Sequence, residues 1–242
     1  WASTMAQLPN YLDSDGLANY FPPQDGSTGR GSDTLTAHLL NMSALAQGVD
    51  KRFVIPAGER AHMEDGLIAF VEGRIQRNFW SPRKDLEMRK LAAIAALALS
   101  GKATPRMLDS INITPNQWPT HAVIDLVMLL QRMKDAPQRD ERLAQAQQIL
   151  RSRLTFNGTR VGFSTDQDDG WWWLMQSPDV NLARLILITV NDPSWTPDMP
   201  RLVSGFIGRQ QAGAWSTTTA NLWGALALRR FSAKFESEPV AG

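Results

Sequence analysis

Residues 210–228 have the sequence Gln210-Gln211-Ala212-Gly213-Ala214-Trp215-Ser216-Thr217-Thr218-Thr219-Ala220-Asn221-Leu222-Trp223-Gly224-Ala225-Leu226-Ala227-Leu228. Gly213 indicates a turn. A hydroxyl within 216–218 can cap the next helix by accepting a hydrogen bond from one of its first free N–H groups. From 220 to 228 only Asn221 interrupts an apolar surface. Because a helix that is apolar all round must be covered on all sides, the stretch predicts an inner helix of an all-helical protein.

Other segments of the chain alternate between the same two types of helix. Segments that are apolar on every side are predicted at 86–99, 121–133 and 180–190, in addition to 218–229. Amphipathic helices are predicted at 59–78, 137–152 and 197–210, and a mostly apolar helix, capped by Ser32 or Asp33, runs to about 47. Gly101 is predicted to end the helix at 86–99. Short loops make neighbouring helices antiparallel. The predicted fold class is therefore all-α, an α/α toroid of inner and outer helices with a short β-hairpin. A repeat solenoid is the competing arrangement, but no constant sequence period supports it.

The helix at 59–78 is predicted to have one solvent-facing side. Its apolar stripe is formed by Met63, Leu67, Phe70, Val71 and Ile75. Charged residues are assigned to the opposite, exposed side, with Glu64 and Arg77 among them.

Local signals predict caps, turns and short strands between the helices. Thr104 and Thr114 each precede a proline, as an N-cap precedes a first helical residue. Asn157-Gly158 predicts a hairpin turn, since these two residues can supply both positive φ angles. Residues 17–21 and 231–237 are predicted to be strands.

Three parts of the chain follow from these elements. Residues 1–31 are an irregular lead-in, 32–230 form the toroid, and 231–242 begin a following strand or linker. The chain starts at Trp1 with no initiator methionine, so we expect an excised piece of a longer protein.

Composition restricts the chemistry that the chain can carry. It has 242 residues, a net charge of +1 and no cysteine. The absence of cysteine excludes disulfides, thiolate metal sites and a cysteine nucleophile within the chain. Without a block of basic residues, no nucleic-acid partner is expected.

Candidate metal and catalytic residues are scattered. His38, His62 and His121 are predicted on three different helices, so no metal site is expected. The loop from Asp166 to Asp169 does not match a calcium-binding loop. It reads Asp-x-Asp-Asp, which resembles the acid motif of class II terpene cyclases, in which burial would raise the pKa of an aspartate.

The Trp171-Trp172-Trp173 run has two interpretations. The rings can stack on a sugar, with Asp168 or Asp169 as a glycosidase acid. Three consecutive aromatic residues more commonly anchor a loop against a core.

Several stretches, in order, resemble the thioester domain of bacterial alpha-macroglobulins. They are Tyr11-Leu12-Asp13-Ser14-Asp15-Gly16-Leu17, Tyr20-Phe21-Pro22, Gly31-Ser32-Asp33-Thr34-Leu35-Thr36-Ala37, Gly162-Phe163 through Trp173, and Gly213 to Leu228. The last stretch, Gly-x-Trp-x-Thr-Thr followed by an Ala/Leu-rich helix, is the most specific of them.

The resemblance implies an α/α toroid inside a long, peptidase-trapping protein. In members that carry it, a Cys-x-Glu-Gln thioester captures a nucleophile from the attacking peptidase. This chain has neither Cys nor Glu-Gln, so no thioester residue is identifiable. Either the motif lies upstream of Trp1 or the protein belongs to the branch that lacks it.

The sequence thus predicts a non-enzymatic domain of an endopeptidase inhibitor that contributes to bacterial defence. Its expected partners are attacking peptidases and neighbouring β-domains of the same polypeptide. The resemblance implies a periplasmic location, anchored to the inner membrane as a lipoprotein. We expect no catalytic, cofactor-binding or metal-binding residue, and a structural role for Gly213, Trp215, Thr217 and Thr218. The alternative is an α/α-toroid enzyme, terpene cyclase-like or glycoside-active, that uses the Asp166–Asp169 loop.

Overall fold

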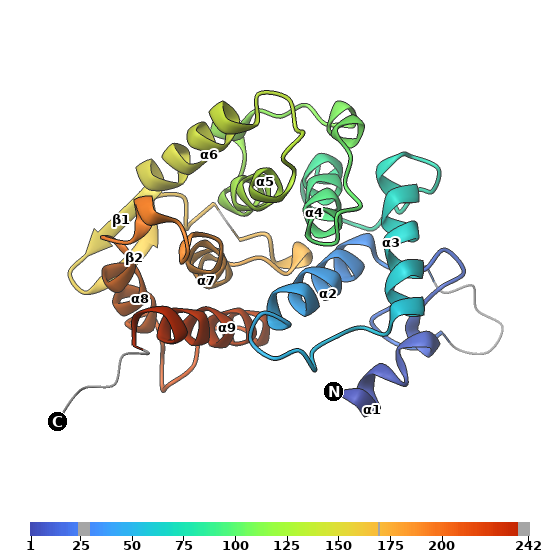
Figure 1. Cartoon of the computed structure of the whole chain (residues 1–242), viewed down its shortest axis with the longest axis horizontal. Coiled ribbons are helices and arrows are strands. Elements are labelled where there is room, and N and C mark those ends of the chain that lie inside the picture. The colour runs from blue at the N-terminus through green and yellow to red at the C-terminus, as the bar shows by residue number, and fades with distance from the viewer. Residues whose placement is uncertain (24–29, 169, 237–242) are drawn as a thin grey trace. The chain divides into compact units, whose positions relative to one another are not determined.

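The computed structural model describes residues 1–23, 30–168 and 170–236. Most of them are helical (Figure 1). The α-helices are α1 (Ala2–Met5), α2 (Asp33–Ala46), α3 (Ala57–Val71), α4 (Leu86–Leu99), α5 (Thr120–Arg132), α6 (Arg139–Arg153), α7 (Pro178–Thr189), α8 (Met199–Ile207) and α9 (Thr218–Phe235). Short 3-10 helices are η1 (Leu8–Tyr11), η2 (Pro105–Ser110), η3 (Pro115–Gln117), η4 (Trp172–Leu174) and η5 (Pro193–Trp195). Strands β1 (Leu154–Asn157) and β2 (Arg160–Phe163) pair antiparallel. The predicted all-α class with a short β-hairpin is confirmed.

The chain forms two compact units. The first unit contains Trp1–Thr114 and Met128–Leu143, and the second contains Pro115–Val127 and Ala144–Gly242. The division predicted at 31 and 230 stays a prediction. The arrangement of the helices in an inner and an outer ring stays a prediction. Within the described residues, no helix is both long and apolar enough to cross a bilayer.

Helices α2, α3 and α4 pack on one another and form most of the first unit (Figure 1). The Ser32 side chain accepts a hydrogen bond from Leu35 N at 3.2 Å, and so caps α2 as predicted. Gly101, at φ +72°, follows the end of α4, where the sequence placed it. Helix α3 ends at 71 rather than 78, because Gly73 adopts φ +76°, a left-handed conformation that stops a helix.

The lead-in of the first unit is held by the buried carboxylate of Asp13. One oxygen accepts from the N–H groups of Asp15 and Leu17 at 3.0 and 2.9 Å, and the other from Gly31 N at 2.8 Å. Arg77 Nη2 donates to the same carboxylate at 2.7 Å. A single side chain thus joins a turn, the start of α2 and the loop that follows α3.

The strand predicted at 17–21 does not form. Ala18 makes only isolated bridges, to Leu12 and Ser32, and its N–H donates to the hydroxyl of Thr36 at 2.8 Å. Because side chains take up these backbone groups, no continuous ladder develops.

A second buried ion pair continues from the first. Arg89, on α4, donates through Nε to Asp33 at 2.9 Å and through Nη2 to the carbonyl of Arg77 at 2.6 Å. Its guanidinium lies 5.3 Å from the ring centroid of Phe70. The charge of Arg89 is therefore shared between a carboxylate, a carbonyl and an aromatic face.

Two charged residues are buried although the sequence predicted them on the solvent-facing side of the helix at 59–78. Arg77 is 8% exposed and Glu64 is 5% exposed. Arg77 lies beyond the end of α3, so helical periodicity does not govern its direction. Glu64 faces the packed side of α3 together with Leu67 and lines a cavity.

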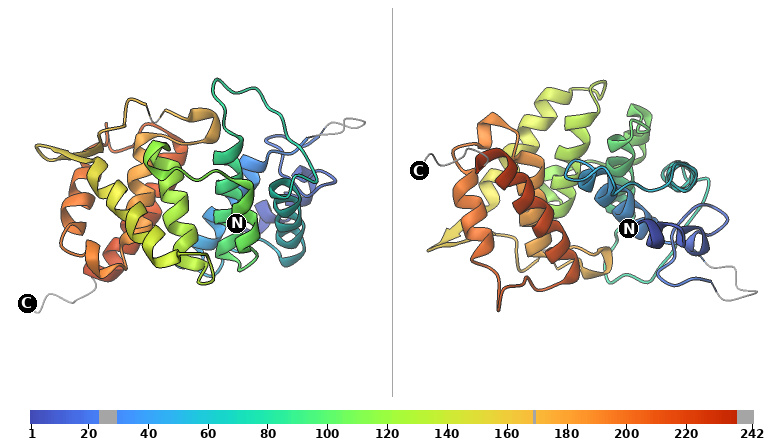
Figure 2. Two further views of the ribbon diagram at one scale, coloured as in Figure 1. Left: turned by 90° about the horizontal axis from the view of Figure 1, so that it is seen from above. Right: turned by 60° about the horizontal axis from the view of Figure 1, so that its bottom comes forward.

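The second unit is formed around contacts of α7 with α9 and α8, and of α8 with β2. Gly205, on α8, permits the contact between α8 and β2, because a Cβ at this position would lie 2.8 Å from Val161. The turn of the hairpin projects away from the helices (Figure 2).

Several local predictions for the turns and caps are wrong in detail. The hairpin loop is Gly158-Thr159, since Asn157 pairs with Arg160, and only the glycine has a positive φ, of 60°. That is the pattern of a turn with glycine at its first central position. Thr104 precedes a helix that starts with proline, but its side chain makes no capping hydrogen bond.

Residues 231–235, predicted to be a strand, continue α9. The rings of Phe231 and Phe235 are stacked with centroids 4.9 Å apart. Their spacing of four residues places them on one helical face, and this local contact favours the helix.

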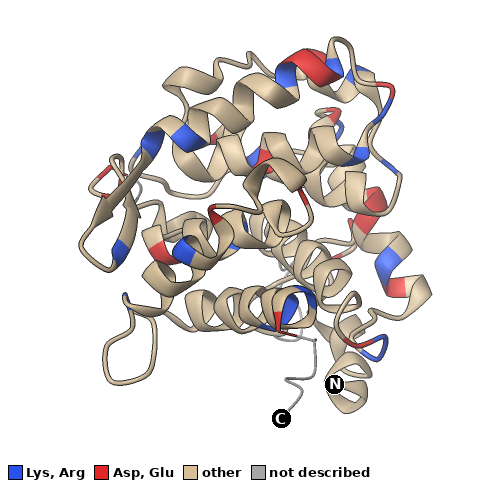
Figure 3. Cartoon of the chain, turned by 60° about the vertical axis from the view of Figure 1, so that its left-hand side comes forward, with Lys and Arg blue, Asp and Glu red and all other residues tan. Residues whose placement is uncertain are grey.

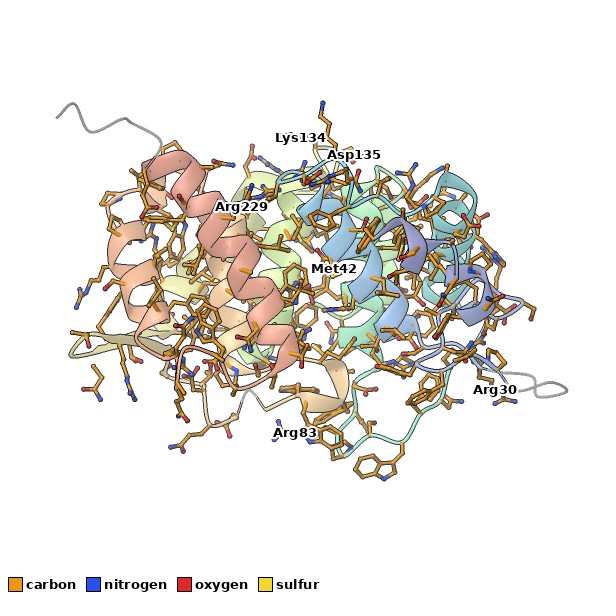
Figure 4. All side chains as sticks on the ribbon, turned by 90° about the horizontal axis from the view of Figure 1, so that it is seen from below. Arg30, Met42, Arg83, Lys134, Asp135 and Arg229 are labelled. Carbon is orange, nitrogen blue, oxygen red and sulfur yellow. The ribbon has the colours of Figure 1, made fainter. Side chains whose placement is uncertain are left out.

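Three leucines, one on each of α5, α7 and α9, test the prediction that these helices are buried, and all three are buried. Leu129, Leu187 and Leu226 are 0%, 4% and 8% exposed. However, α9 has an exposed face, on which Leu222 is 37% exposed and which continues through Arg229 (Figure 4). Single apolar residues are common on protein surfaces. The apolar composition of α9 therefore led to a prediction of more complete burial than the structure shows.

Helix α6 carries charges of both signs (Figure 3). Asp140 and Glu141 occupy its first turn, and Arg151 and Arg153 its last. Acidic residues at the N-terminus and basic residues at the C-terminus of a helix interact favourably with its dipole, so this order stabilises α6.

We predict that Asp13→Asn destabilises the chain and weakens its acid sensitivity. Burial raises the pKa of Asp13, but hydrogen bonds from Gly31, Leu17 and Arg77 outweigh it, so the pKa lies below its ordinary 3.8. A depressed folded-state pKa gives stability that is complete above 3.8 and lost as pH falls through the folded-state value. Removing one partner of a buried pair costs about 3–5 kcal/mol.

Urea unfolding between pH 7 and pH 2 measures both effects. The variant should be less stable at pH 7 and lose less stability below about pH 4. Asp109→Asn, at an exposed position, is the control and should follow the parent. An Asp13→Asn variant with the parent's acid profile would contradict the assignment.

Candidate functional site

Trp215 lies at the centre of the stretch that predicted the fold, and its side chain is 7% exposed. Its ring stacks on Phe206 of α8 with centroids 4.3 Å apart and an interplanar angle of 11°. Its indole N–H donates to the carbonyl of Phe206 at 3.0 Å. Both the apolar ring and the polar N–H are therefore satisfied by α8.

Two side chains, those of Thr217 and Asn221, hydrogen-bond to the backbone at the start of α9. The hydroxyl of Thr217 accepts from Ala220 N at 3.0 Å, so this threonine is the cap among the three candidates. Asn221 accepts from Trp215 N at 3.0 Å and donates to the carbonyl of Trp215 at 2.9 Å. Gly213, at φ +82°, makes the preceding turn, whereas Thr218 is exposed at the first helical position.

Gly224 allows α9 to approach this tryptophan. A Cβ at Gly224 would lie 2.5 Å from Cζ3 of Trp215. In the sequence, Gly224 is part of an apolar run, and a glycine in the interior of a helix is the signal of its role.

A buried carboxylate connects the same turn to the hairpin. Asp179, in the first turn of α7, accepts from Nε of Arg209 at 2.6 Å and from the hydroxyl of Ser216 at 2.9 Å. Arg209 also donates to Asp166 at 3.1 Å and to the carbonyl of Val161 at 3.2 Å. No sequence pattern identifies Asp179 or Arg209, because their partners are remote in sequence.

These residues border a surface pocket of the second unit. Its volume is about 500 Å³. The lining residues are Arg160, Pro178, Asp179, Arg209, Gln211, Ala214, Trp215 and Ser216. Asp179 and Arg209 in this lining are paired with one another, so they hold the turn in place.

The acidic loop is used structurally where the structure describes it. Asp166 accepts from Phe163 N at 3.1 Å in addition to its ion pair with Arg209. Asp168 is exposed, and its N–H donates to the carbonyl of Thr165 at 2.9 Å. Asp169 lies outside the described residues. An exposed Asp168 does not have the burial that an alkene-protonating acid requires.

The three tryptophans occupy different environments. Trp171 is 7% exposed and Trp172 is 68% exposed. The ring of Trp173 contacts both, with centroid distances of 5.1 Å to Trp171 and 5.8 Å to Trp172. Trp171 also contacts His121, 5.2 Å away. The run therefore anchors its loop through Trp171, as the second interpretation expected.

The three histidines do not come together. His62 lies on α3, where its ring nitrogen is 3.4 Å from the carbonyl of Ser14, and His38 lies on α2. His121 is buried in α5, and burial, with a smaller effect from Arg184, lowers its pKa to about 3. In the described part of the chain, no three His, Asp or Glu residues form a cluster that could hold a metal ion.

Arg184 and Asp125 form a further buried ion pair in this unit. Arg184 lies 5.9 Å from the ring centroid of Trp223, on α9. The pair joins α5 to α7, and the contact with Trp223 joins α7 to α9.

Comparisons with known proteins identify solved structures that share the fold of this chain. No protein-family model and no curated protein sequence matches the chain. It matches the structure of native alpha-2-macroglobulin from Escherichia coli, spanning domain MG7 to the C-terminus, with a TM-score of 0.63 and 15% identity. The match covers 96% of this chain and 34% of that chain.

Two other structures of the E. coli protein give the same result. The native form determined by cryo-electron microscopy matches with a TM-score of 0.62 at 15% identity, over 96% of this chain and 14% of that chain. The trypsin-activated form matches with a TM-score of 0.62 at 16% identity, over 95% and 14%. The chain thus has the fold of a region of bacterial alpha-2-macroglobulin and spans about a third or less of those chains. The resemblance inferred from the sequence is confirmed at the level of the fold.

We predict that Trp215→Ala destabilises the chain much more than loss of the helix cap. Truncation of a buried tryptophan costs about 3–5 kcal/mol, whereas loss of an N-cap hydroxyl costs about 1 kcal/mol. In thermal unfolding, the melting temperature of Trp215→Ala should therefore be lower than that of Thr217→Ala. Thr218→Ala is the matched control and should melt like the parent, because its side chain is exposed. Equal melting temperatures for Trp215→Ala and the parent would refute a structural role.

We predict that Gly224→Ala is destabilising only while Trp215 is present. Alanine favours a helix over glycine by about 1 kcal/mol, but its Cβ would overlap the indole ring. In a Trp215→Ala background the overlap is absent, so adding Gly224→Ala should cause no further loss. A double-mutant cycle by urea unfolding measures this coupling. Gly58→Ala in α3, with no atom within 4 Å of its Cβ, is the control and should not destabilise; additive effects at 215 and 224 would exclude the contact.

Proposed function

We propose that this chain is the thioester-type domain of a bacterial alpha-macroglobulin and forms part of a bait-and-trap inhibitor of peptidases. The observation that carries the proposal is the structural match to E. coli alpha-2-macroglobulin over 96% of the chain. The Gly213-x-Trp215-x-Thr217-Thr218 stretch supports it, since the residues that resemble the family motif are those that fix α9 on α8.

A role without catalysis agrees with the site. Asp166 and Asp179 are paired with Arg209, and His121 is buried with a lowered pKa. The enzyme alternative based on the Asp166–Asp169 loop has no observation in its favour.

The partners follow from the same proposal. Solved structures of the E. coli protein include forms activated by porcine elastase and by trypsin. We infer that the longer polypeptide containing this chain meets attacking peptidases, and that neighbouring β-domains of that polypeptide contact this chain. A periplasmic location with an inner-membrane anchor is part of the proposal. Because the chain has no cysteine, the proposal assigns no residue of a thioester to it.

The test uses the full-length protein encoded by the gene. The protein is incubated with trypsin or elastase, and digestion of a protein substrate is then measured. We predict that a stoichiometric amount slows this digestion and that the peptidase migrates with the inhibitor in native electrophoresis. The 242-residue chain alone is the control and should not inhibit.

Two results would contradict the proposal. One is digestion at the uninhibited rate, with the peptidase migrating free. The other is turnover of a peptide, glycan or terpenoid by the chain that disappears in Asp168→Asn, which would favour the enzyme alternative.

A further inference from the structure

The turn of the β-hairpin contains an asparagine whose side chain neither the fold nor the proposed function uses. Strand β1 ends at Asn157 and β2 begins at Arg160, so the Asn157-Gly158 pair lies where the chain leaves the first strand. The turn projects away from the helices (Figure 2), and every residue from 157 to 160 is exposed. Solvent therefore reaches both the side chain of Asn157 and the backbone that follows it.

The two groups of this pair that can react with each other are not held by hydrogen bonds. Among the described residues, the side-chain amide of Asn157 has no hydrogen-bond partner, and the N–H of Gly158 donates to no acceptor. A Cβ built on Gly158 would meet no atom within 4 Å, so the space around this glycine is open.

An asparagine in this setting can form a ring with the backbone. The nitrogen of Gly158, after losing its proton to water or hydroxide, attacks Cγ of Asn157. A new N–Cγ bond forms, the bond from Cγ to the side-chain nitrogen breaks, and that nitrogen leaves as ammonia. The product is a succinimide ring. Glycine favours the attack because it has no Cβ beside the nucleophilic nitrogen.

We propose that Asn157 is a site of spontaneous deamidation in the folded protein. Water is the second reactant, and it opens the succinimide at either of the two carbonyl carbons. Opening at Cγ restores the original backbone and leaves an aspartate. Opening at the backbone carbonyl leaves an isoaspartate, in which the main chain runs through Cβ and Cγ. Both routes consume one water molecule and replace a neutral amide with a carboxylate.

The new charge would lie beside a cation of the second unit. Asn157 pairs with Arg160 across the hairpin, and Arg160 lines the pocket that Asp179 and Trp215 border. An aspartate at 157 would face this arginine, and opposite charges in that position favour strand pairing. An isoaspartate would lengthen the main chain and disturb this last pair. Val161 stays packed against Gly205 in either case, so the change is confined to the turn.

Two similar pairs in the chain lack the free nitrogen. Asp15-Gly16 and Asp65-Gly66 also place a glycine after a side chain that can form the ring. However, the N–H of Gly16 donates to the carbonyl of Asp13 at 3.0 Å. Gly66 lies inside α3, where backbone N–H groups donate along the helix. A nitrogen held in this way is less able to lose its proton and turn towards the side chain.

The experiment is incubation of the folded chain at neutral and at alkaline pH, followed by peptide mapping in a mass spectrometer. We expect the mass increase for replacement of NH₂ by OH in the peptide that contains Asn157. Isoaspartate is detected in the same peptide by enzymatic methylation with labelled S-adenosylmethionine. The rate should rise with pH, because the deprotonated nitrogen is the nucleophile. Circular dichroism confirms that the chain stays folded during the incubation.

An internal reference and two variants locate the reaction. Asn112 is exposed like Asn157 but is followed by the β-branched Ile113, so it should stay intact while Asn157 reacts. Gly158→Ala adds a Cβ beside the nucleophile and should slow the reaction severalfold. If the φ of +60° at this position prevents the alanine variant from folding, Asn157→Gln is the second variant. Its longer side chain would form a larger ring, so its peptide should stay unmodified.

Several outcomes would overturn the proposal. One is an intact Asn157 after an incubation that modifies Asn112. Another is formation of aspartate without isoaspartate, which would indicate direct hydrolysis of the side-chain amide. An unchanged rate in folded Gly158→Ala, or equal modification in Asn157→Gln, would also exclude the ring. None of these results bears on inhibition of peptidases, so this inference and the proposed function succeed or fail separately.

Discussion

Both units of this chain depend on the same constraint, which is that an arginine buried in a helical core must find a carboxylate from another element. In the first unit, Arg77 pairs with Asp13 and Arg89 with Asp33. In the second, the buried Arg184 pairs with Asp125 and the half-buried Arg209 with Asp179. Each pair connects segments that are at least 30 residues apart. Such pairs add little net stability compared with apolar residues, but removing one partner leaves a buried charge unpaired.

These ion pairs explain how irregular segments are held in a protein that is mostly helical. Residues 13–17 form no regular element, yet the Asp13 carboxylate accepts their N–H groups and Arg77 neutralises it. In the same way, Arg209 and Asp179 hold the hairpin and the turn before α9. Loops with satisfied backbone groups can be buried, which a helical core alone would not permit.

Trp215 and Glu64 show two ways in which a polar group is accommodated in the core: through contacts with other elements and through a partner on the same helix. Every polar atom of Trp215 has a partner, and Gly224 leaves space for its ring. This explains a specific sequence motif without any chemical role. Glu64, by contrast, is buried beside its counter-ion Arg60, one helical turn away on α3.

The sequence by itself determined most of the helices, their alternation of apolar and amphipathic character, and the capped entry to α9. These features depend on interactions within a few residues, such as the Ser32 and Thr217 caps and the positive φ of Gly101 and Gly213. Only the tertiary structure decided that Glu64 and Arg77 are buried, that Asp179 and Arg209 form a pair, and that Leu222 is exposed. Their environments depend on partners tens of residues away, and helical periodicity contains no information about which side of a helix a distant segment will cover.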